Sequence, residues 1–197
     1  MARIPLDTEH NGLLARLISW YSRRKLGTFA QPLAAVAHHP GVLLVGTRLE
    51  MGVSRRWRRL DPTLQCLAVM AAASRIGCSW CMDFGYWEFY NRDVDPTKIG
   101  DVPRWRESEV YSELERWVLE YAEAMTDTPP TVTDEMVARL RARLGDPRLV
   151  ELTALVSLEN MRSRTNSAFG LESQGFKAAC DLPAERLPAA GPVASGR

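Results

Sequence analysis

The chain has 197 residues, with 25 lysines and arginines against 24 aspartates and glutamates, which leaves a formal net charge of +1. A chain of this length buries roughly 70% of its surface on folding, so it can form a hydrophobic core without disulfide staples. The near-neutral balance argues against charge-driven nucleic-acid binding, and a content of 46% hydrophobic and 25% charged residues is typical of an ordinary globular protein.

The sequence predicts neither a signal peptide nor a membrane-spanning helix. Charged residues interrupt the first thirty positions, so the apolar core of a signal peptide is missing. The longest apolar run, residues 66–73, is far shorter than the roughly 20 residues that a spanning helix needs. Four cysteines without an export signal are not the pattern of a disulfide framework. We therefore expect a cytoplasmic protein that binds neither membranes nor nucleic acid.

Helical periodicity dominates the first half of the chain. Asn11 can cap a helix that runs to about Leu26, with apolar residues at helical spacing. A region interrupted by prolines and an apolar stretch over 42–49 follow. Asp61, directly before a proline, is typical of an N-cap and predicts a helix that ends near Gly77.

The second half continues in the same way. Cys78 opens a helix that we expect to reach about Asn91, and a strongly amphipathic pattern predicts another over 108–125. Thr133 caps a helix that stops before Gly145, and a further Asp-Pro pair starts the next one. No segment shows sustained alternation, so the fold class is predicted to be all-α.

The domain organisation predicted from these patterns is simple. A single helical domain covers residues 1–181, with its core over 60–176. Residues 182–197 are rich in proline, alanine and glycine, a composition typical of a disordered tail.

The sequence contains one internal echo. Shifted by 85 positions, the Asp-Pro-x-Leu-x-x-Leu pattern that begins at Asp61 lies over the same pattern at Asp146. Phe84-Gly85 lies over Phe169-Gly170 in the same register, which favours a duplicated helical hairpin over a chance match. Because cysteines of a close pair occur in the first copy alone, the two copies must differ in chemistry.

Cys78-Ser79-Trp80-Cys81 is the sharpest motif in the chain. Two cysteines three residues apart lie on one face of a helical turn and can close a disulfide with little backbone change. A helix N-terminus also favours the thiolate, because unpaired N–H groups and the helix dipole stabilise negative charge there. This pattern predicts thiol–disulfide exchange or peroxide reduction, with two buried structural cysteines as the alternative.

We expect no metal and no other cofactor. A structural zinc site needs four ligands, and the other candidates are scattered without a second close pair. These candidates are Cys66, Cys180, His38 and His39. Cys66 falls in an apolar helical pattern, which favours a small core residue over a third redox thiol.

Residues 60–88, with the Cys-x-x-Cys motif at their centre, resemble the core of the alkylhydroperoxidase D and carboxymuconolactone decarboxylase superfamily. Residues 159–168 resemble the second hairpin of its longer bacterial members, and the likeness covers most of 60–176. The resemblance implies an all-helical, oligomeric fold. It also implies that Cys81 attacks the peroxide and that Cys78 is its resolving partner.

The sequence departs from the redox branch of that superfamily at two positions. The redox branch carries a relay glutamate where this chain has Cys66, and a relay histidine where this chain has Gly85. The proton relay that activates the thiols in that branch is therefore missing at its usual positions.

Three carboxylates are candidates to replace the relay. Glu88 lies on the same helical stripe as the cysteines, and Gly85 is expected to leave open space between them for water or substrate. Asp83 projects to another side and requires a tertiary contact to act as a base. Glu151 is the echo of Cys66, so pseudo-symmetry places it near the site. The alternative for each carboxylate is a solvated surface position.

The sequence thus favours a thiol-dependent oxidoreductase of the alkylhydroperoxidase type, with peroxiredoxin-type antioxidant activity. The expected partners are a small hydroperoxide or other small molecule, a dithiol reductant, and further copies of the chain in a homo-oligomer. One alternative is a descendant that keeps the fold for binding or structure and has lost the chemistry. The other is acid–base chemistry on a small lactone or acid.

Overall fold

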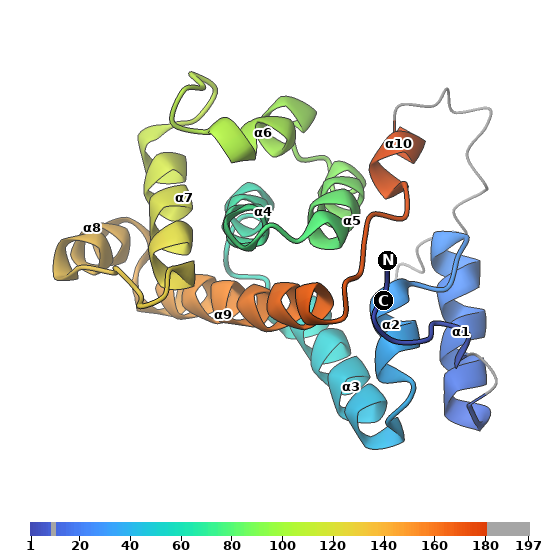
Figure 1. Ribbon diagram of the computed structural model, residues 1–197. Coiled ribbons are helices and arrows are strands. Elements are labelled where there is room, and N and C mark those ends of the chain that lie inside the picture. The colour runs from blue at the N-terminus through green and yellow to red at the C-terminus, as the bar shows by residue number, and fades with distance from the viewer. Residues whose placement is uncertain (9–10, 181–197) are drawn as a thin grey trace, which may run out of the picture.

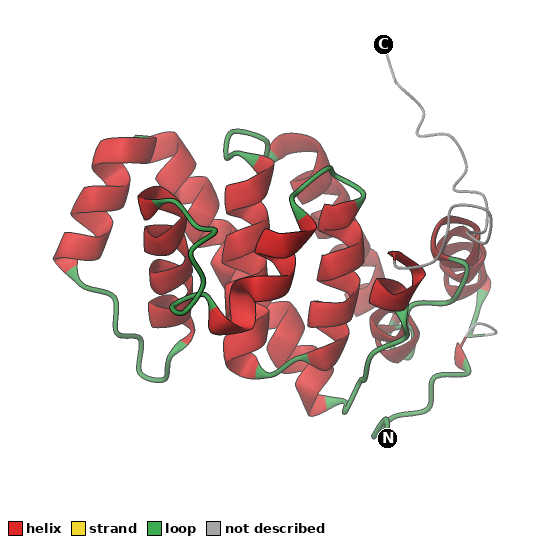
Figure 2. Ribbon diagram, turned by 90° about the horizontal axis from the view of Figure 1, so that it is seen from above, coloured by secondary structure: helices red, strands yellow, loops and turns green. Residues whose placement is uncertain are grey.

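The computed structural model describes residues 1–8 and 11–180, and the expected tail over 182–197 lies outside the described residues. Throughout this described part the chain is helical and contains no strand, which confirms the all-α prediction (Figure 1, Figure 2). None of its helices is both long enough and apolar enough to cross a bilayer. In chain order the elements are α1 (Leu13–Leu26), α2 (Gln31–Val36), α3 (Pro40–Arg56), α4 (Pro62–Ile76), α5 (Ser79–Tyr90), α6 (Pro96–Asp101), the 3-10 turn η2 (Val102–Arg104), α7 (Glu113–Thr126), α8 (Asp134–Leu144), α9 (Asp146–Ala168) and α10 (Phe176–Cys180).

Helix α4 is the centre of the fold. Figure 1 shows it nearly end-on, with α5, α7 and α9 packed around it. Every side chain from Leu64 to Ala73 is buried, which is why this stretch is apolar on all sides rather than amphipathic. The helix starts at Asp61, whose side chain accepts a hydrogen bond from the Thr63 N–H, and ends at Gly77. Both ends lie where the sequence predicts them.

The start of α7 differs from the prediction. The helix begins at Glu113 rather than near Ser108, because Ser112 and Glu115 form a reciprocal capping box. The segment between α5 and α7 contains α6 and η2, whose six and three residues are too short to show a periodic pattern.

The repeat takes a different form in its two copies. The first copy is α4 and α5 joined by a turn at Gly77, whose φ of 81° is a left-handed conformation that favours glycine. The second copy is α9, one continuous helix of 23 residues, so the predicted second hairpin is not formed. The residue that lies over Gly77 in the echo is Arg162, and without a glycine the helix continues through this position.

After α9 the chain runs along α5 as a strap, residues 171–180, that includes α10. Figure 1 shows the strap, α1 and α2 together on the side of α5 away from α7. Near the start of the strap, the Arg3 N–H donates to the Phe169 carbonyl at 2.7 Å, so the N-terminal arm is attached to the end of α9. These segments surround the beginning of α5, where the cysteine motif lies.

Candidate active site

Cys78 and Cys81 form a disulfide at the start of α5, with their Cα atoms 5.3 Å apart. Cys78 is the N-cap residue, and its Sγ accepts a hydrogen bond from the Cys81 backbone N–H at 3.2 Å. In the reduced state, this N–H and the positive end of the helix dipole stabilise a thiolate at Cys78. The two sulfurs therefore lie as the motif predicts, at bonding distance and at a helix N-terminus.

The two sulfurs are shielded from bulk water. Cys78 is 2% exposed and Cys81 is 6% exposed. They pack in a small apolar cluster with Ala30 of the α1–α2 region, Leu171 and Phe176. In this oxidised form, a reductant can reach the sulfurs only where this cover opens.

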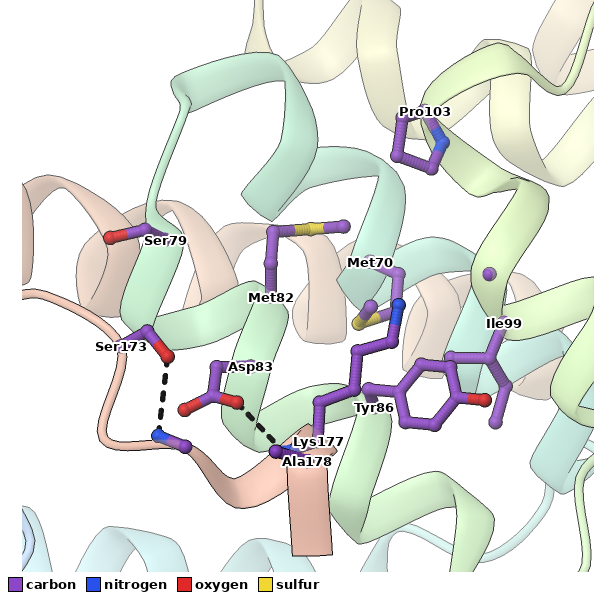
Figure 3. Close-up of a pocket in the computed structure, with 12 residues that line it drawn as sticks. Met70, Ser79, Met82, Asp83, Tyr86, Ile99, Pro103, Ser173, Lys177 and Ala178 are labelled. Atoms are coloured by element: carbon purple, nitrogen blue, oxygen red, sulfur yellow. Dashed lines mark hydrogen bonds between the residues drawn. The ribbon is translucent and has the colours of Figure 1, made fainter. Parts of the chain in front are cut away.

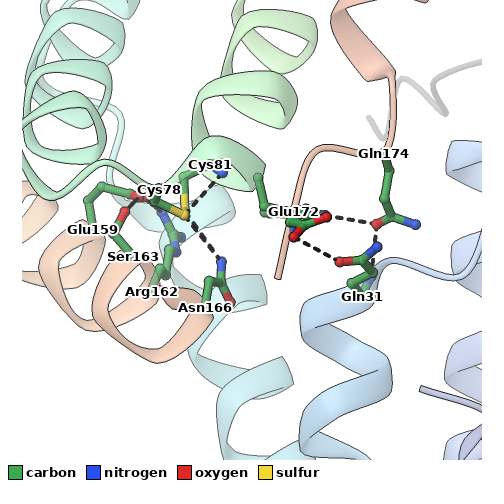
Figure 4. Close-up of a disulfide and its surroundings, with 10 residues drawn as sticks. Gln31, Cys78, Cys81, Glu159, Arg162, Ser163, Asn166, Glu172 and Gln174 are labelled. Atoms are coloured by element: carbon green, nitrogen blue, oxygen red, sulfur yellow. Dashed lines mark hydrogen bonds and ion pairs between the residues drawn. A yellow bond between two sulfur atoms is a disulfide. The ribbon is translucent and has the colours of Figure 1, made fainter. Parts of the chain in front are cut away.

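Gln174 holds the cover in place. Its Oε1 accepts hydrogen bonds from Trp80 Nε1 at 2.8 Å and from the Gln31 N–H at 2.9 Å, while its Nε2 donates to the Phe29 carbonyl at 3.2 Å. Figure 4 shows Gln174 and Gln31 together with the disulfide. One strap residue thus connects α5 to the beginning of α2.

A polar face of α9 lies against the disulfide. Glu159, Ser163 and Asn166 follow one another at spacings of four and three, so they share one helical face, and all three are buried. Asn166 Nδ2 donates to Cys81 Sγ at 3.3 Å and lies 4.0 Å from Cys78 Sγ. Figure 4 shows Glu159 and Ser163 on the Cys78 side of this face and Asn166 next to the sulfurs.

Glu159 is an ionisable group in a nearly dry position. It is 2% exposed, and Ser163 Oγ donates to its Oε1 at 2.6 Å. Burial raises the pKa of Glu159 to about 7, although the Arg162 guanidinium and the Ser163 hydroxyl oppose the shift. Arg162 lies 3.4 Å from Glu159 Oε2, but its closer partner is Glu50 of α3, which accepts from Arg162 Nε at 2.8 Å and also contacts Nη2.

The sequence interpretation missed Glu159, Ser163 and Asn166 as site residues. A signal for two of them was present in the echo, because Ser163 lies over Cys78 and Asn166 lies over Cys81 at the shift of 85. In this fold Asn166 contacts Cys81, its own equivalent in the first copy. The second copy therefore supplies the polar neighbours of the cysteines.

Glu88, one of the predicted carboxylates, is exposed on α5 and lies close enough to Arg162 to interact with its charge. The open space expected at Gly85 is filled, so this prediction was wrong. A Cβ atom at Gly85 would lie 2.5 Å from Met70 Sδ, because α4 packs closely on α5 here. A side chain at position 85 would therefore require the Met70 side chain to move.

Asp83 faces the strap and not the sulfurs. Its carboxylate accepts hydrogen bonds from the backbone N–H groups of Gln174 at 2.9 Å, Phe176 at 3.1 Å and Lys177 at 2.8 Å. Burial opposes the charged form, but these bonds outweigh it and lower the pKa of Asp83. Asp83 therefore anchors the strap as a carboxylate.

We expect Asp83→Ala to accelerate amide hydrogen exchange at Gln174, Phe176 and Lys177, because three backbone donors lose their acceptor. A lowered native pKa also means that Asp83 stabilises the strap above the ordinary aspartate pKa, about 4, and that this support is lost as the pH falls through the native value. Exchange at the same amides in Asp61→Ala, which removes a cap elsewhere, is the control. Unchanged exchange in Asp83→Ala would contradict the anchoring role.

Glu151 lies at the opposite end of α4 from the cysteines. Its carboxylate accepts from the N–H groups of Arg59, at 3.0 and 3.1 Å, and Leu60, at 3.1 Å, and from Gln65 Nε2 at 3.3 Å. A helix of 15 residues separates these contacts from Cys78, which corresponds to roughly 20 Å. The expectation that pseudo-symmetry places Glu151 near the sulfurs is therefore wrong.

Two other residues that precede the motif, Cys66 and Arg75, have structural roles away from the sulfurs. Cys66 is fully buried in the core, as predicted, and burial raises the pKa of its thiol above the ordinary range. Arg75, one turn before the motif, pairs with Asp127 at 2.8 Å on the surface. The side-chain contact to the sulfurs comes instead from Asn166 on the α9 face.

A cavity of about 460 Å³ lies between α5, α6 and the strap (Figure 3). Its walls include Met70, Met82, Tyr86 and Lys177, whose Nζ lies 4.7 Å from the Tyr86 ring centre. Cys78 and Cys81 are not among the residues that line it. A molecule bound in this cavity would therefore not touch the disulfide.

Fold and site together define an all-helical protein of the alkylhydroperoxidase D type with a dithiol/disulfide centre. The sequence model of the carboxymuconolactone decarboxylase family matches residues 44–124. The uncharacterized protein YnjA of Escherichia coli (strain K12) is 33% identical over 174 residues, which are 88% of this chain and 94% of YnjA. The chain belongs to the carboxymuconolactone decarboxylase family.

Two solved structures share the fold. An uncharacterized peroxidase-related protein from Silicibacter sp. TM1040 superposes with a TM-score of 0.78 at 16% identity, over 89% of this chain and 94% of that one. The debrominase Bmp8 superposes with a TM-score of 0.73 at 20% identity, over 89% and 93% of the two chains. At these identities the likeness concerns the fold, and the two neighbours differ in the activity that their names state.

Proposed function

We propose that the protein is a thiol-dependent oxidoreductase that reduces a hydroperoxide through the Cys78–Cys81 dithiol/disulfide couple. The observation that carries the proposal is the pair of sulfurs at bonding distance on a helix N-terminus, each with a hydrogen-bond donor. Cys78 Sγ accepts from the Cys81 N–H, and Cys81 Sγ accepts from Asn166 Nδ2. Such donors stabilise thiolates, which are the reactive form of cysteine.

The reaction has three balanced steps. In the first, the Cys81 thiolate attacks the distal peroxide oxygen, the O–O bond breaks, and the leaving alkoxide takes up a proton as an alcohol. In the second, the Cys78 sulfur attacks the Cys81 sulfenic acid, the S–S bond forms, and hydroxide leaves as water with the Cys78 proton. In the third, a dithiol reductant restores both thiols and is itself oxidised to a disulfide.

The burial of both sulfurs favours a second candidate function. A disulfide that is 2% and 6% exposed at its two residues can also be a structural staple in a protein that binds a ligand without redox turnover. The two candidates differ in one measurable property, the response of the reduced thiols to peroxide.

The test is a count of free thiols. The protein is reduced, freed of reductant, treated with one equivalent of an organic hydroperoxide, quenched in acid, unfolded and alkylated. We expect Cys78 and Cys81 to escape alkylation after peroxide and to be fully alkylated without it, with Cys66 as the internal control because it is buried in the core. If both motif thiols remain alkylatable after peroxide, the redox proposal is overturned and the structural candidate stands.

Assembly belongs to the same proposal. Leu13, Leu17 and Trp20 are 73%, 55% and 63% exposed on one face of α1. An exposed apolar face of this kind is typical of a contact surface, and it supports a homo-oligomer.

A further inference from the structure

Glu159 is a buried carboxyl group on the face of α9 that meets the cysteines. Ser163, its hydrogen-bond donor at 2.6 Å, is fully buried and lies on the same face one turn further along. Figure 4 shows both side chains on the Cys78 side of the disulfide. The second copy therefore places a buried carboxyl group on the same helical face as Asn166, whose amide contacts Cys81.

A firm ion pair does not hold Glu159 in one charge state. Its nearest cation, Arg162, contacts it at 3.4 Å but binds Glu50 more closely through two nitrogen atoms. Because the guanidinium is shared, burial still disfavours the Glu159 carboxylate enough for the group to exchange a proton near neutral pH. A group with this property can act as acid and as base in one cycle.

We propose that Glu159 carries the proton of the resolving step, which rests on the proposed function above. As the Cys78 sulfur attacks the Cys81 sulfenic sulfur, Glu159 accepts the Cys78 thiol proton. It then delivers that proton to the departing hydroxide, which leaves as water. One S–S bond forms, one S–O bond breaks, and Glu159 returns to its carboxylate, so the step needs no other proton donor. Ser163 positions the carboxyl group.

The charged groups around Glu159 set the pH at which it works. On α9 these are Arg162 and the polar Ser163, and on α3 the like charge of Glu50 raises the pKa of Glu159. Glu88 of α5 acts on Arg162. Under this proposal Glu159 and the Cys78 thiol share a proton, so their two protons come off in steps that belong to the pair.

The decisive experiment measures two quantities in reduced wild type and in Glu159→Gln. One is the apparent thiol pKa, from the ultraviolet absorbance of the thiolate as a function of pH. The other is the rate at which the sulfenic acid, formed by a pulse of hydroperoxide, condenses to the disulfide. Glutamine keeps the shape and the Ser163 contact, and Arg162 keeps Glu50, so the variant is expected to fold.

The two quantities should move in opposite ways in Glu159→Gln. Without the neighbouring negative charge, the thiol pKa falls, yet condensation slows by roughly a hundred-fold because the leaving hydroxide has lost its proton donor. The wild-type condensation rate should have a bell-shaped pH profile, because Glu159 and the Cys78 thiol must together hold one proton. The Glu159→Gln variant should keep only the limb on which the rate rises with pH, because only the Cys78 thiol still titrates. Glu109→Gln, the control at an exposed carboxylate outside this charge network, retains the bell. A condensation rate and profile unchanged in Glu159→Gln overturn the inference.

A surface variant keeps the inference testable if Glu159→Gln does not fold. Glu50→Gln removes the negative charge near Glu159 and frees the Arg162 guanidinium to pair with Glu159. The bell-shaped pH profile of the condensation rate should therefore shift to lower pH. An unshifted profile contradicts the role of Glu159. Failure of the proposed function can be told apart from failure of the Glu159 inference. In the first case hydroperoxide forms no sulfenic acid in the wild type, whereas the thiol pKa still reports whether Glu159 is coupled to the two cysteines.

Discussion

A Cys81→Ser variant is expected to lose hydroperoxide reduction by roughly a thousand-fold or more, because a serine hydroxyl is neither ionised near neutral pH nor able to form a sulfenic acid. The Asn166 amide and the helix N-terminus remain in this variant, but they have no thiolate to stabilise at the attacking position. The measurement is single-turnover peroxide consumption by the reduced protein.

Cys78→Ser is the matched variant, and it should fail at a different step. It retains the attacking sulfur, so it consumes one equivalent of peroxide and accumulates the sulfenic acid of Cys81, which a sulfenic-acid-specific probe labels. Disulfide formation is then absent. If the sulfenic acid instead accumulates on Cys78 in Cys81→Ser, the N-cap sulfur is the attacking one and the assignment of the two cysteines must be reversed.

The local signals in the sequence were sufficient for the scaffold. Asp61, Gly77, Cys78 and Thr133 mark helix ends in the structure, since capping depends on a few neighbouring residues and is readable without tertiary information. The α7 start was misplaced because the capping box at Ser112 lies within a pattern that already looked amphipathic before it.

The composition of the candidate site depended on tertiary packing, and there the sequence interpretation was incomplete. The two cysteines lie together because they share a helical turn. The space at Gly85 was misjudged because only the packing of Met70 against it shows that the position is filled. Asp83 was placed correctly as a residue of another helical face, but the strap that occupies it comes from more than 90 residues away in the chain.

The neighbours from α9 illustrate the same limit. Glu159, Ser163 and Asn166 have the polarity of a surface stripe, and in an isolated helix they would face water. Their burial follows from the packing of α9 on α4 and α5, which sets Asn166 against its own equivalent, Cys81. The echo did not produce a second hairpin, but applied to the cysteines rather than to Cys66 it indicated the neighbour of Cys81, Asn166.

Glu151→Ala should reduce stability strongly while leaving the thiol chemistry intact. The substitution removes the acceptor of two backbone N–H groups, at Arg59 and Leu60, and of the Gln65 amide, at a position where Glu151 is 7% exposed. Buried donors without a partner cost about 3 kcal/mol together, and in a chain of this size that lowers the melting temperature by roughly 10 °C. Thermal unfolding measures the effect.

The control for Glu151→Ala is Glu109→Ala, which removes an exposed carboxylate and should change stability by less than about 0.5 kcal/mol. The second readout is the rate of disulfide formation after peroxide, at a temperature where both variants are folded. Since α4 separates Glu151 from the sulfurs, this rate should equal that of the wild type. A slower rate of disulfide formation with unchanged stability would contradict this prediction. It would mean that Glu151 takes part in the thiol chemistry rather than in the stability of the fold.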